Sequence, residues 1–304
     1  MNKKDILVTV KCTVYNHESY LRQCLDGFVM QRTRFNFEVL VHDDASSDES
    51  ARIIKEYAKK YPQIIIPIFE ETNQYSQGGF YRIISIMNEK IRGKYIAICE
   101  GDDFWIDEYK LQKQVDYMEK HPECGLVYTK MKQLNQLTGK VTLGWAHQAK
   151  FKEIITTNNP ISTPTTLMRK DIYDDFYSKV NVDKSWKMAD YPLWLYISYY
   201  MKIKCLDDVT TTYRILPNSA SHNTNFKKNL DFIYSGYDIS LFFVNYFKED
   251  ILLPQIHRHV QNCIFDLGRA HHKKVSFEVF KYAFKTKSLT VRLLVKIFCF
   301  MFKF

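Results

Sequence analysis

The chain of 304 residues is 46% hydrophobic and 15% aromatic, which is enough apolar side chain for one large α/β domain or two smaller ones. This composition excludes a disordered, collagen-like or low-complexity protein. The net charge is +9, but residues 251–304 hold ten basic and two acidic side chains while residues 1–199 are almost balanced. The charge pattern therefore argues against a nucleic-acid groove across the body, and no nucleic acid is expected as a partner.

The seven cysteines stand singly, without the close pairs of a zinc site or the pattern of a disulfide framework. Such cysteines are typical of reduced thiols in a cytoplasmic protein. The N-terminus leads into a strand-like segment with no long apolar stretch, so we expect no cleaved secretory signal. The cytoplasm is the expected compartment.

An alternation of strands and helices is predicted for the first hundred residues. The predicted strands share runs of β-branched and other apolar residues, and they are 6–15, 37–41, 64–69 and 95–99. The predicted helices share apolar residues at helical spacing, and they are 19–30, 49–61 and 80–91. This alternation builds a mostly parallel sheet with helices on its faces.

The pattern is less regular after residue 100. The further predicted elements are helices 110–121 and 191–201, strands 125–131 and 203–215, a hairpin turn at Thr138-Gly139, and a turn in 161–168 that leads into a strand. From about residue 223 the chain is predicted to form helices joined by short loops. We place a domain boundary near residue 222, between a first domain of residues 1–222 and a helical region of residues 223–304.

Polar loops follow three of the predicted strands. Asn16 follows the first strand, Asp43-Asp44 the second, and Asp102-Asp103 the strand 95–99. Because the carboxyl ends of parallel strands meet at one edge of a sheet, we expect the three loops to form one site. Adjacent carboxylates repel each other unless a cation compensates, and Mg²⁺ or Mn²⁺, completed by phosphates and water, suits this role. The alternative is that each aspartate pair caps the helix after it.

These residues, in this order and spacing, resemble the family 2 glycosyltransferases. The similarity rests on VYNHESYL at 14–21, VHDDASSD at 41–48 and EGDDFW at 100–105, and it extends through 161–170, 189–195 and 212–222. It implies the GT-A fold, an α/β architecture with a Rossmann-like, mostly parallel central sheet flanked by helices, here with a helical C-terminal extension. The resemblance covers roughly residues 5–222.

The resemblance also implies a role for each matching position. The residues matched to binding of a nucleotide-diphosphate sugar donor are Tyr15, Asn16, Glu18, Asp43, Asp44, Asp102 and Arg214. The first five lie against the base in the family, and Arg214 corresponds to an element near the diphosphate. The divalent cation, Mg²⁺ or Mn²⁺, is expected on Asp102 or Asp103, and Asp190 matches the catalytic base.

Three positions depart from the family pattern. Glu100 stands where many members have aspartate, so it is secondary to Asp102 and Asp103 as a metal ligand. Ala189 stands where a glutamate is frequent, which leaves Asp190 as the single candidate base. Leu216 stands where many relatives carry histidine, and His222, near Ser219 and Ser221, is the substitute ligand.

Two of these residues also have structural interpretations. Asp190 precedes Pro192 and the apolar residues of a predicted helix, so it is also a good helix N-cap. Arg214 could form an ion pair with Asp207 or Asp208 in place of a phosphate contact.

Residues 287–304 form a basic and apolar tail. On a helix, Arg292, Lys296 and Lys303 fall on one side, and the rest is covered largely by Phe298, Phe300, Met301 and Phe302. Eighteen residues rise about 27 Å, slightly less than a bilayer core, and the interior charges argue against spanning. The tail has the profile of a helix at an anionic membrane surface; the alternative is a helix packed on the catalytic domain.

We therefore expect an inverting, metal-dependent glycosyltransferase, of the hexosyltransferase class, in polysaccharide biosynthesis. It would move a sugar from a nucleotide diphosphate to a hydroxyl of a cell-surface glycan or lipid-linked acceptor. The expected place is the cytoplasm, peripherally on the inner face of the plasma membrane. One alternative is a non-catalytic protein that docks on membranes or glycans with this scaffold. The other is a receiver-type domain that binds phosphate and Mg²⁺, a class whose usual length is nearer half of this chain.

Overall fold

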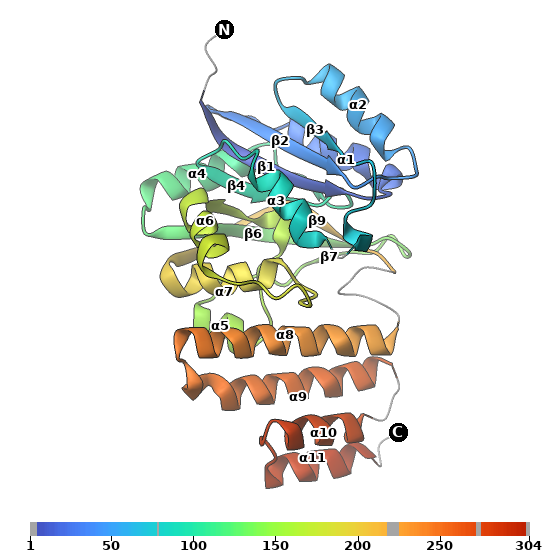
Figure 1. Ribbon diagram of the computed structural model, residues 1–304, viewed down its shortest axis with the longest axis vertical. Coiled ribbons are helices and arrows are strands. Elements are labelled where there is room, and N and C mark those ends of the chain that lie inside the picture. Colours follow the sequence, from blue (N-terminus) through green and yellow to red (C-terminus); the bar gives the residue numbers. More distant parts are fainter. Residues whose placement is uncertain (1–4, 78, 218–224, 272–274, 302–304) are drawn as a thin grey trace. The chain divides into compact units, whose positions relative to one another are not determined.

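The computed structural model describes residues 5–77, 79–217, 225–271 and 275–301 (Figure 1). Contacts within the chain divide it into two compact units. The first is Met1–Lys150, Pro160–Lys184 and Ile197–Ile215, and the second is Phe151–Asn159, Ser185–Tyr196 and Leu216–Phe304. The domain boundary near residue 222 stays a prediction.

A nine-stranded mixed sheet forms the centre of the first unit, in the order β3-β2-β1-β4-β8-β6-β9-β5, with β7 paired to β6. The strands are β1 Ile6–Val14, β2 Asn36–Asp43, β3 Ile65–Phe69, β4 Tyr95–Ile98, β5 Phe104–Trp105, β6 Cys124–Asn135, β7 Val141–Leu143, β8 Leu167–Arg169 and β9 Lys202–Ile215. The first four strands pair in parallel, as predicted. The second half is mixed, because β8 runs antiparallel to both β4 and β6 while β6 and β9 are parallel.

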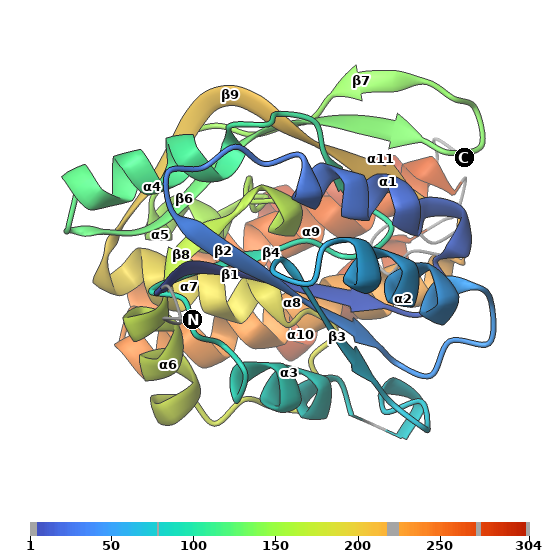
Figure 2. The same ribbon diagram turned by 90° about the horizontal axis from the view of Figure 1, so that it is seen from above.

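Helices cover both faces of the parallel part of the sheet. In the first unit they are α1 Glu18–Val29, α2 Ser50–Lys60, α3 Phe80–Asn88, α4 Lys110–Lys120 and α6 Lys170–Lys179, with the 3-10 helices η1 Tyr75–Gln77 and η2 Thr163–Thr165. Figure 2 shows α1 and α4 on one side of β1, and α3 and α6 on the other. Alternate residues of β1 explain this arrangement: Val8 and Val10 join the core beneath α1 and α4, while Lys11 reaches Tyr173 of α6.

The second unit is helical. Its helices are α5 Phe151–Thr156, the first turns of α7 Asp190–Tyr200, α8 Phe226–Phe247, α9 Leu253–Ala270, α10 Ser276–Lys285 and α11 Val291–Met301, with the 3-10 helix η3 Asp250–Leu252. Aromatic rings stabilise this unit; Phe247 of α8 stacks edge-on against Phe151 of α5, with 5.4 Å between ring centroids. The helical C-terminal region is therefore confirmed.

The predicted tail helix begins at Val291, and a separate helix, α10, ends before it at Lys285. Phe302 and Lys303 of the predicted tail lie outside the described residues, as do Ser219, Ser221 and His222. Within the described ranges, none of the helices combines the length and apolar character that a bilayer crossing requires.

Candidate active site

The three polar loops predicted to converge do meet at one edge of the sheet. Strand β1 pairs in parallel with β2 and with β4, so the carboxyl ends of all three strands point the same way. Backbone hydrogen bonds continue past the strands: Asp44 donates to the carbonyl of Val14 (3.0 Å), and Gly101 donates to that of Thr13 (3.0 Å). The Asp43-Asp44 and Asp102-Asp103 pairs therefore flank the end of β1.

The first loop is held to the second by its own side chains. Asn16, at a left-handed φ of 54°, accepts the backbone N–H of Ser47 on Oδ1 (2.8 Å). Glu18 accepts the backbone N–H of Glu49 on Oε2 (2.9 Å). Tyr15 is 48% exposed. Thus Asn16 and Glu18 have a structural role in joining the loops, and Tyr15 offers an accessible ring; donor binding by the three stays a prediction.

The two aspartates at the end of β2 have different environments, although both are buried. Asp44 accepts the backbone N–H groups of Gln74 (2.7 Å) and Tyr75 (3.0 Å), one on each carboxylate oxygen, and so holds the start of η1. Asp43 has a buried Oδ1 atom that accepts no hydrogen bond among the described residues. Burial raises the pKa of Asp43. Asp43 is therefore the better candidate for a ligand contact.

The second aspartate of the later pair is also committed to the fold. Asp103 is 3% exposed and accepts the backbone N–H of Arg214 in β9 on Oδ1 (2.7 Å). Burial raises its pKa well above the usual value, and the neighbouring charges of Asp102 and Glu100 raise it further. Asp102 itself is only partly buried. This crowding of carboxyl groups is the feature that a bound cation would relieve.

The donor set fits a divalent cation that a substrate helps to bind. Carboxylate oxygens such as those of Asp102 and Asp103 are ligands that Mg²⁺ and Mn²⁺ prefer. Across the described ranges, no group of three or more His, Cys, Asp or Glu side chains is arranged to hold a metal. A cation here would take one or two protein carboxylates and complete its shell with phosphate oxygens and water, as Mg²⁺ usually does.

Arg214 joins the edge of the sheet to α1. Its guanidinium donates to Gln136 (3.1 Å) and Gln23, and lies over the rings of Phe104 (4.6 Å to the centroid) and Tyr20 (5.1 Å). The Nε–H is buried and has no partner among the described residues. Burial lowers the pKa of Arg214, partly offset by Asp103. This buried N–H group therefore lacks, within the described chain, the acceptor that buried donors usually have.

The alternative ion pairs predicted for Arg214 are wrong. Asp207 pairs with Lys130 (2.8 Å), and Asp208 pairs with Lys113 (2.7 Å). Arg214 instead contacts glutamines on other elements. Asp207 and Asp208 lie seven and six residues before it, which is about 20 Å along an extended strand.

His17 is a site residue that sequence reasoning missed. It precedes α1, and a Cβ added at Gly101 would come within 2.9 Å of its Nδ1 atom, so the two loops touch here. That Nδ1 atom is buried and has no partner in the described part of the chain. Burial lowers the pKa of His17, opposed by the charges of Asp102, Asp48 and Asp43. Its position directly after the first strand is the only sequence feature that could have placed His17 in the site.

His42 lies in the VHDDASSD motif, one residue before the end of β2. It is fully buried in β2, and its Nε2 atom lies 3.2 Å from Glu70 Oε1, just beyond the end of β3. The contact joins two neighbouring parallel strands, so the structure gives His42 a role in the sheet.

Asp190 is the first residue of α7 and belongs to the second unit. Its Oδ1 atom accepts the backbone N–H of Tyr191 (2.8 Å), a contact at the exposed N–H end of the helix. Tyr191 is buried, and its hydroxyl lies 3.1 Å from the hydroxyl of Ser240 in α8. Tyr191 thus contacts Asp190 through its backbone and Ser240 through its hydroxyl, which restrains the Asp190 side chain. The catalytic role of Asp190 stays a prediction.

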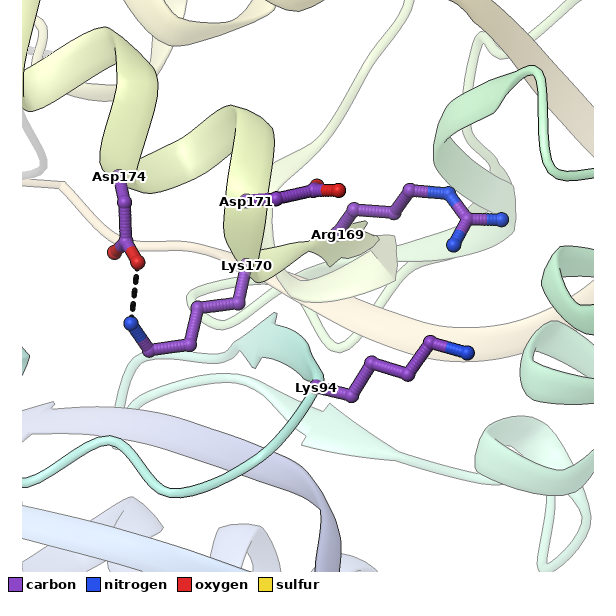
Figure 3. Close-up of a pocket in the computed structure, with 5 residues that line it drawn as sticks. All are labelled: Lys94, Arg169, Lys170, Asp171 and Asp174. Carbon is purple, nitrogen blue, oxygen red and sulfur yellow. Dashed lines mark hydrogen bonds and ion pairs between the residues drawn. The ribbon is translucent and has the colours of Figure 1, made fainter.

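A pocket at the opposite end of β4 is not part of this site (Figure 3). It is lined by Lys94, Arg169, Lys170, Asp171 and Asp174. Lys94 precedes β4, whereas the aspartate loop follows it. Lys170 forms an ion pair with Asp174, Arg169 donates to backbone carbonyls, and Asp171 accepts the backbone N–H of Ile172.

The fold and the convergent loops define a GT-A type protein, and comparison with known proteins identifies its family. The model of "Glycosyl transferase family 2" matches residues 9–176, so the chain belongs to the family 2 glycosyltransferases, as the motifs predicted. The receiver-type alternative is thereby excluded. An uncharacterized protein of Mycobacterium bovis, Mb1547, is 38% identical over 170 residues, 55% of this chain and 48% of that protein. The chain thus spans about half the length of this relative.

Solved structures confirm the fold. Staphylococcus aureus TarS 1-349 in complex with UDP-GlcNAc has a TM-score of 0.67 at 18% identity, covering 95% of this chain and 83% of that one. The mannosyltransferase PcManGT of Pyrobaculum calidifontis, in complex with GDP-Man and Mn²⁺, has a TM-score of 0.60 at 12% identity, covering 99% and 88%. At these identities the likeness establishes the GT-A fold alone.

Proposed function

We propose that this protein is an inverting, metal-dependent glycosyltransferase that uses a nucleotide-diphosphate sugar as donor. The observation that carries the proposal is the crowding of Asp102, Asp103 and Glu100 at the carboxyl edge of the sheet, with Asp103 buried among like charges. A divalent cation and the diphosphate that it binds would offset this repulsion. The two neighbours solved with UDP-GlcNAc and with GDP-Man and Mn²⁺ support the donor class.

The roles of the aspartates follow from their environments. Asp102 is the proposed direct metal ligand, because Asp103 is deeper and already accepts the backbone of Arg214. The cation would neutralise the negative charge that grows on the leaving nucleoside diphosphate. Asp43 is the proposed contact to the base, since its unpaired Oδ1 atom would accept an N–H of uracil or guanine. Arg214 Nε would donate to the diphosphate.

Asp190 is the proposed catalytic base. In an inverting transfer the acceptor hydroxyl attacks the anomeric carbon, and a carboxylate receives its proton. We propose that the transferred sugar is a hexose and that the acceptor is a hydroxyl of a cell-surface glycan or a lipid-linked acceptor, in polysaccharide biosynthesis at the inner face of the plasma membrane. The membrane location is supported by the basic C-terminal region, because residues 251–304 contain ten basic and only two acidic residues.

A donor screen tests the proposal. UDP- and GDP-sugars are added to the full chain with Mn²⁺, Mg²⁺ or a chelator, binding is measured by isothermal titration, and release of nucleoside diphosphate is followed. Metal-dependent binding is expected, and Asp102→Asn should weaken it at least about tenfold, the loss of one charged ligand. The control is Asp207→Asn, whose side chain is 95% exposed and pairs with Lys130. The absence of donor binding under all conditions would favour the non-catalytic docking protein.

A further inference from the structure

Helix α10 carries a stripe of exposed phenylalanines. Phe277, Phe280 and Phe284 are 73%, 38% and 72% exposed. Their spacing of three and four residues places the rings on one side of the helix, where Phe280 and Phe284 stack with 6.3 Å between centroids. The opposite side of the helix is buried through Val279 and Ala283. Three clustered phenyl rings on an exposed face form an apolar patch that calls for a binding partner.

Two lysines lie beside this stripe. Lys281 and Lys285 are exposed, and at 100° per residue they follow the phenylalanines around the helix. Neither ammonium group has a carboxylate within ion-pair distance in the described part of the chain. We call Phe277, Phe280, Phe284, Lys281 and Lys285 the α10 surface. It presents apolar rings next to unpaired positive charge.

The α10 surface is not needed to hold the helices of the second unit together. Helix α10 packs against α9 and α11, as Figure 1 shows for this group of helices. Its contacts come from the buried side; the Tyr282 hydroxyl lies 3.2 Å from His257 of α9, and the Ser276 hydroxyl donates to the carbonyl of Ile297 in α11 (3.2 Å). The exposed faces of the three phenylalanines are therefore not used in packing α10 against α9 and α11.

Helix α11 uses part of its surface in packing, and the membrane role that the sequence suggested for the tail stays a prediction. Leu293 and Ile297 are buried, so part of its apolar side is used in packing. Lys296 donates to Asn262 of α9 (2.7 Å) and lies over the ring of Phe265 (4.6 Å to the centroid). Among the side chains that the structure describes, α11 exposes Leu294 (41%) and Phe298 (61%), whereas α10 exposes three phenylalanines on one side.

We propose that the α10 surface docks this protein on an anionic phospholipid bilayer. The phenyl rings enter the boundary between headgroups and acyl chains, and the two ammonium groups bind headgroup phosphates. A second copy of the chain is a poorer occupant, because a symmetric contact through this surface would bring the lysines of both copies together. The proposal concerns where the protein acts and does not depend on the reaction that it catalyses.

Vesicle sedimentation with the full chain tests this proposal. The vesicles contain equal parts of phosphatidylglycerol and phosphatidylcholine, or phosphatidylcholine alone. The wild-type protein should bind the anionic vesicles more tightly, and added salt should weaken the binding. The double variant Phe277→Ser/Phe284→Ser should lose about tenfold or more in partitioning to both vesicles. The double variant Lys281→Gln/Lys285→Gln should lose about tenfold on anionic vesicles only.

The matched control is Ile251→Ser in η3, because Ile251 is 81% exposed and lies in the same unit outside the α10 surface. It should bind vesicles as the wild type does. All substituted side chains are exposed, so unchanged thermal unfolding checks that each variant is folded. Wild-type protein that ignores anionic vesicles, or a serine variant that binds them normally, overturns the proposal. A serine variant that converts a dimer to a monomer without changing vesicle binding assigns the surface to a second copy.

The nucleotide-release assay separates this result from the proposed reaction. Both double variants should release nucleoside diphosphate from a soluble donor at the wild-type rate, because the α10 surface includes none of the proposed donor-binding residues. Failure of vesicle binding with intact turnover removes the docking proposal and the proposed membrane location, and leaves the proposed transfer reaction standing. Failure of turnover with intact vesicle binding removes only the proposed function.

Discussion

The replacement of Lys11 by methionine is expected to change how the stability of this protein depends on pH. Lys11 is 5% exposed in the middle of β1. Its Nζ atom donates to Asn88 Oδ1 (2.8 Å) and to the Tyr173 hydroxyl (2.7 Å), and no carboxylate of the described chain pairs with it. Burial lowers the pKa of Lys11 from 10.5 to about 7. Folding near neutral pH therefore releases part of the proton that Lys11 carries in the unfolded chain.

The size of the effect follows from proton linkage. Because the pKa is lower in the folded state, the unfolded chain binds more protons between about pH 7 and 10.5, and the free energy of unfolding rises with pH in this window. One group contributes at most about 1.4 kcal/mol per pH unit, so Lys11 should add about 2 kcal/mol between pH 7 and pH 9. Methionine retains the apolar stem, and Tyr173 still donates to Asn88 Oδ1 (2.7 Å).

Urea unfolding at pH 7 and pH 9 measures this difference. Lys11→Met should be more stable than the wild type at pH 7 and should gain about 2 kcal/mol less on going to pH 9. Lys110, also buried with a pKa of about 7, is present in both proteins and cancels in the comparison. The exposed Lys59→Met is the control and should follow the wild type. Equal gains for Lys11→Met and the wild type would refute the argument, since Lys11 would then titrate alike in both states.

Three further substitutions test other parts of the structure. Gly101→Ala places a Cβ 2.9 Å from His17 Nδ1, so the loop must shift. We expect a free energy of unfolding about 1–3 kcal/mol lower in urea and weaker donor binding, and unchanged values would contradict the close approach. Lys248→Gly relieves a left-handed φ of 60° at the end of α8 and should add about 0.5–1 kcal/mol to the free energy of unfolding, whereas a loss would mean that the Lys248 side chain stabilises the cap. Asp190→Asn should lower the transfer rate about 10²–10⁴-fold while nucleotide binding persists in titration, and normal turnover would remove Asp190 from the mechanism.

The elements predicted correctly are those with a strong local pattern. Strands β1 to β4 are short apolar runs followed by polar loops, and the helices between them carry apolar residues at helical spacing. Elements α5, α6, β5 and β7 were not predicted. Strands β5 and β7 have two and three residues, too few to show a period, and they form only because a longer strand supplies the pairing. The partner of β5 is distant in sequence, since Phe104 pairs with Thr212, whereas β7 pairs with the preceding strand β6 across the turn predicted at Thr138-Gly139.

The location of the site was predictable, but the division of labour within it was not. Three loops after parallel strands must share an edge, and that inference needs only the strand order. The partner of Asp103 lies 111 residues away at Arg214, and the side-chain partners of Arg214 lie 191 residues away at Gln23 and 78 away at Gln136. No local pattern connects such positions, so the sequence could not show which carboxylate is already used.

The two aspartate pairs share one arrangement that explains how four carboxylates can lie at one edge of the sheet. In each pair the second residue, Asp44 or Asp103, accepts backbone N–H groups from a distant segment and so stabilises the fold. The first residue, Asp43 or Asp102, keeps an oxygen without a partner or a partly exposed carboxylate. Hydrogen bonds from backbone N–H groups spread part of the charge of a carboxylate, which lowers the cost of a second carboxylate next to it. Under the proposed function, Asp43 and Asp102 would meet a base and a cation, while Asp44 and Asp103 hold the loops that carry them.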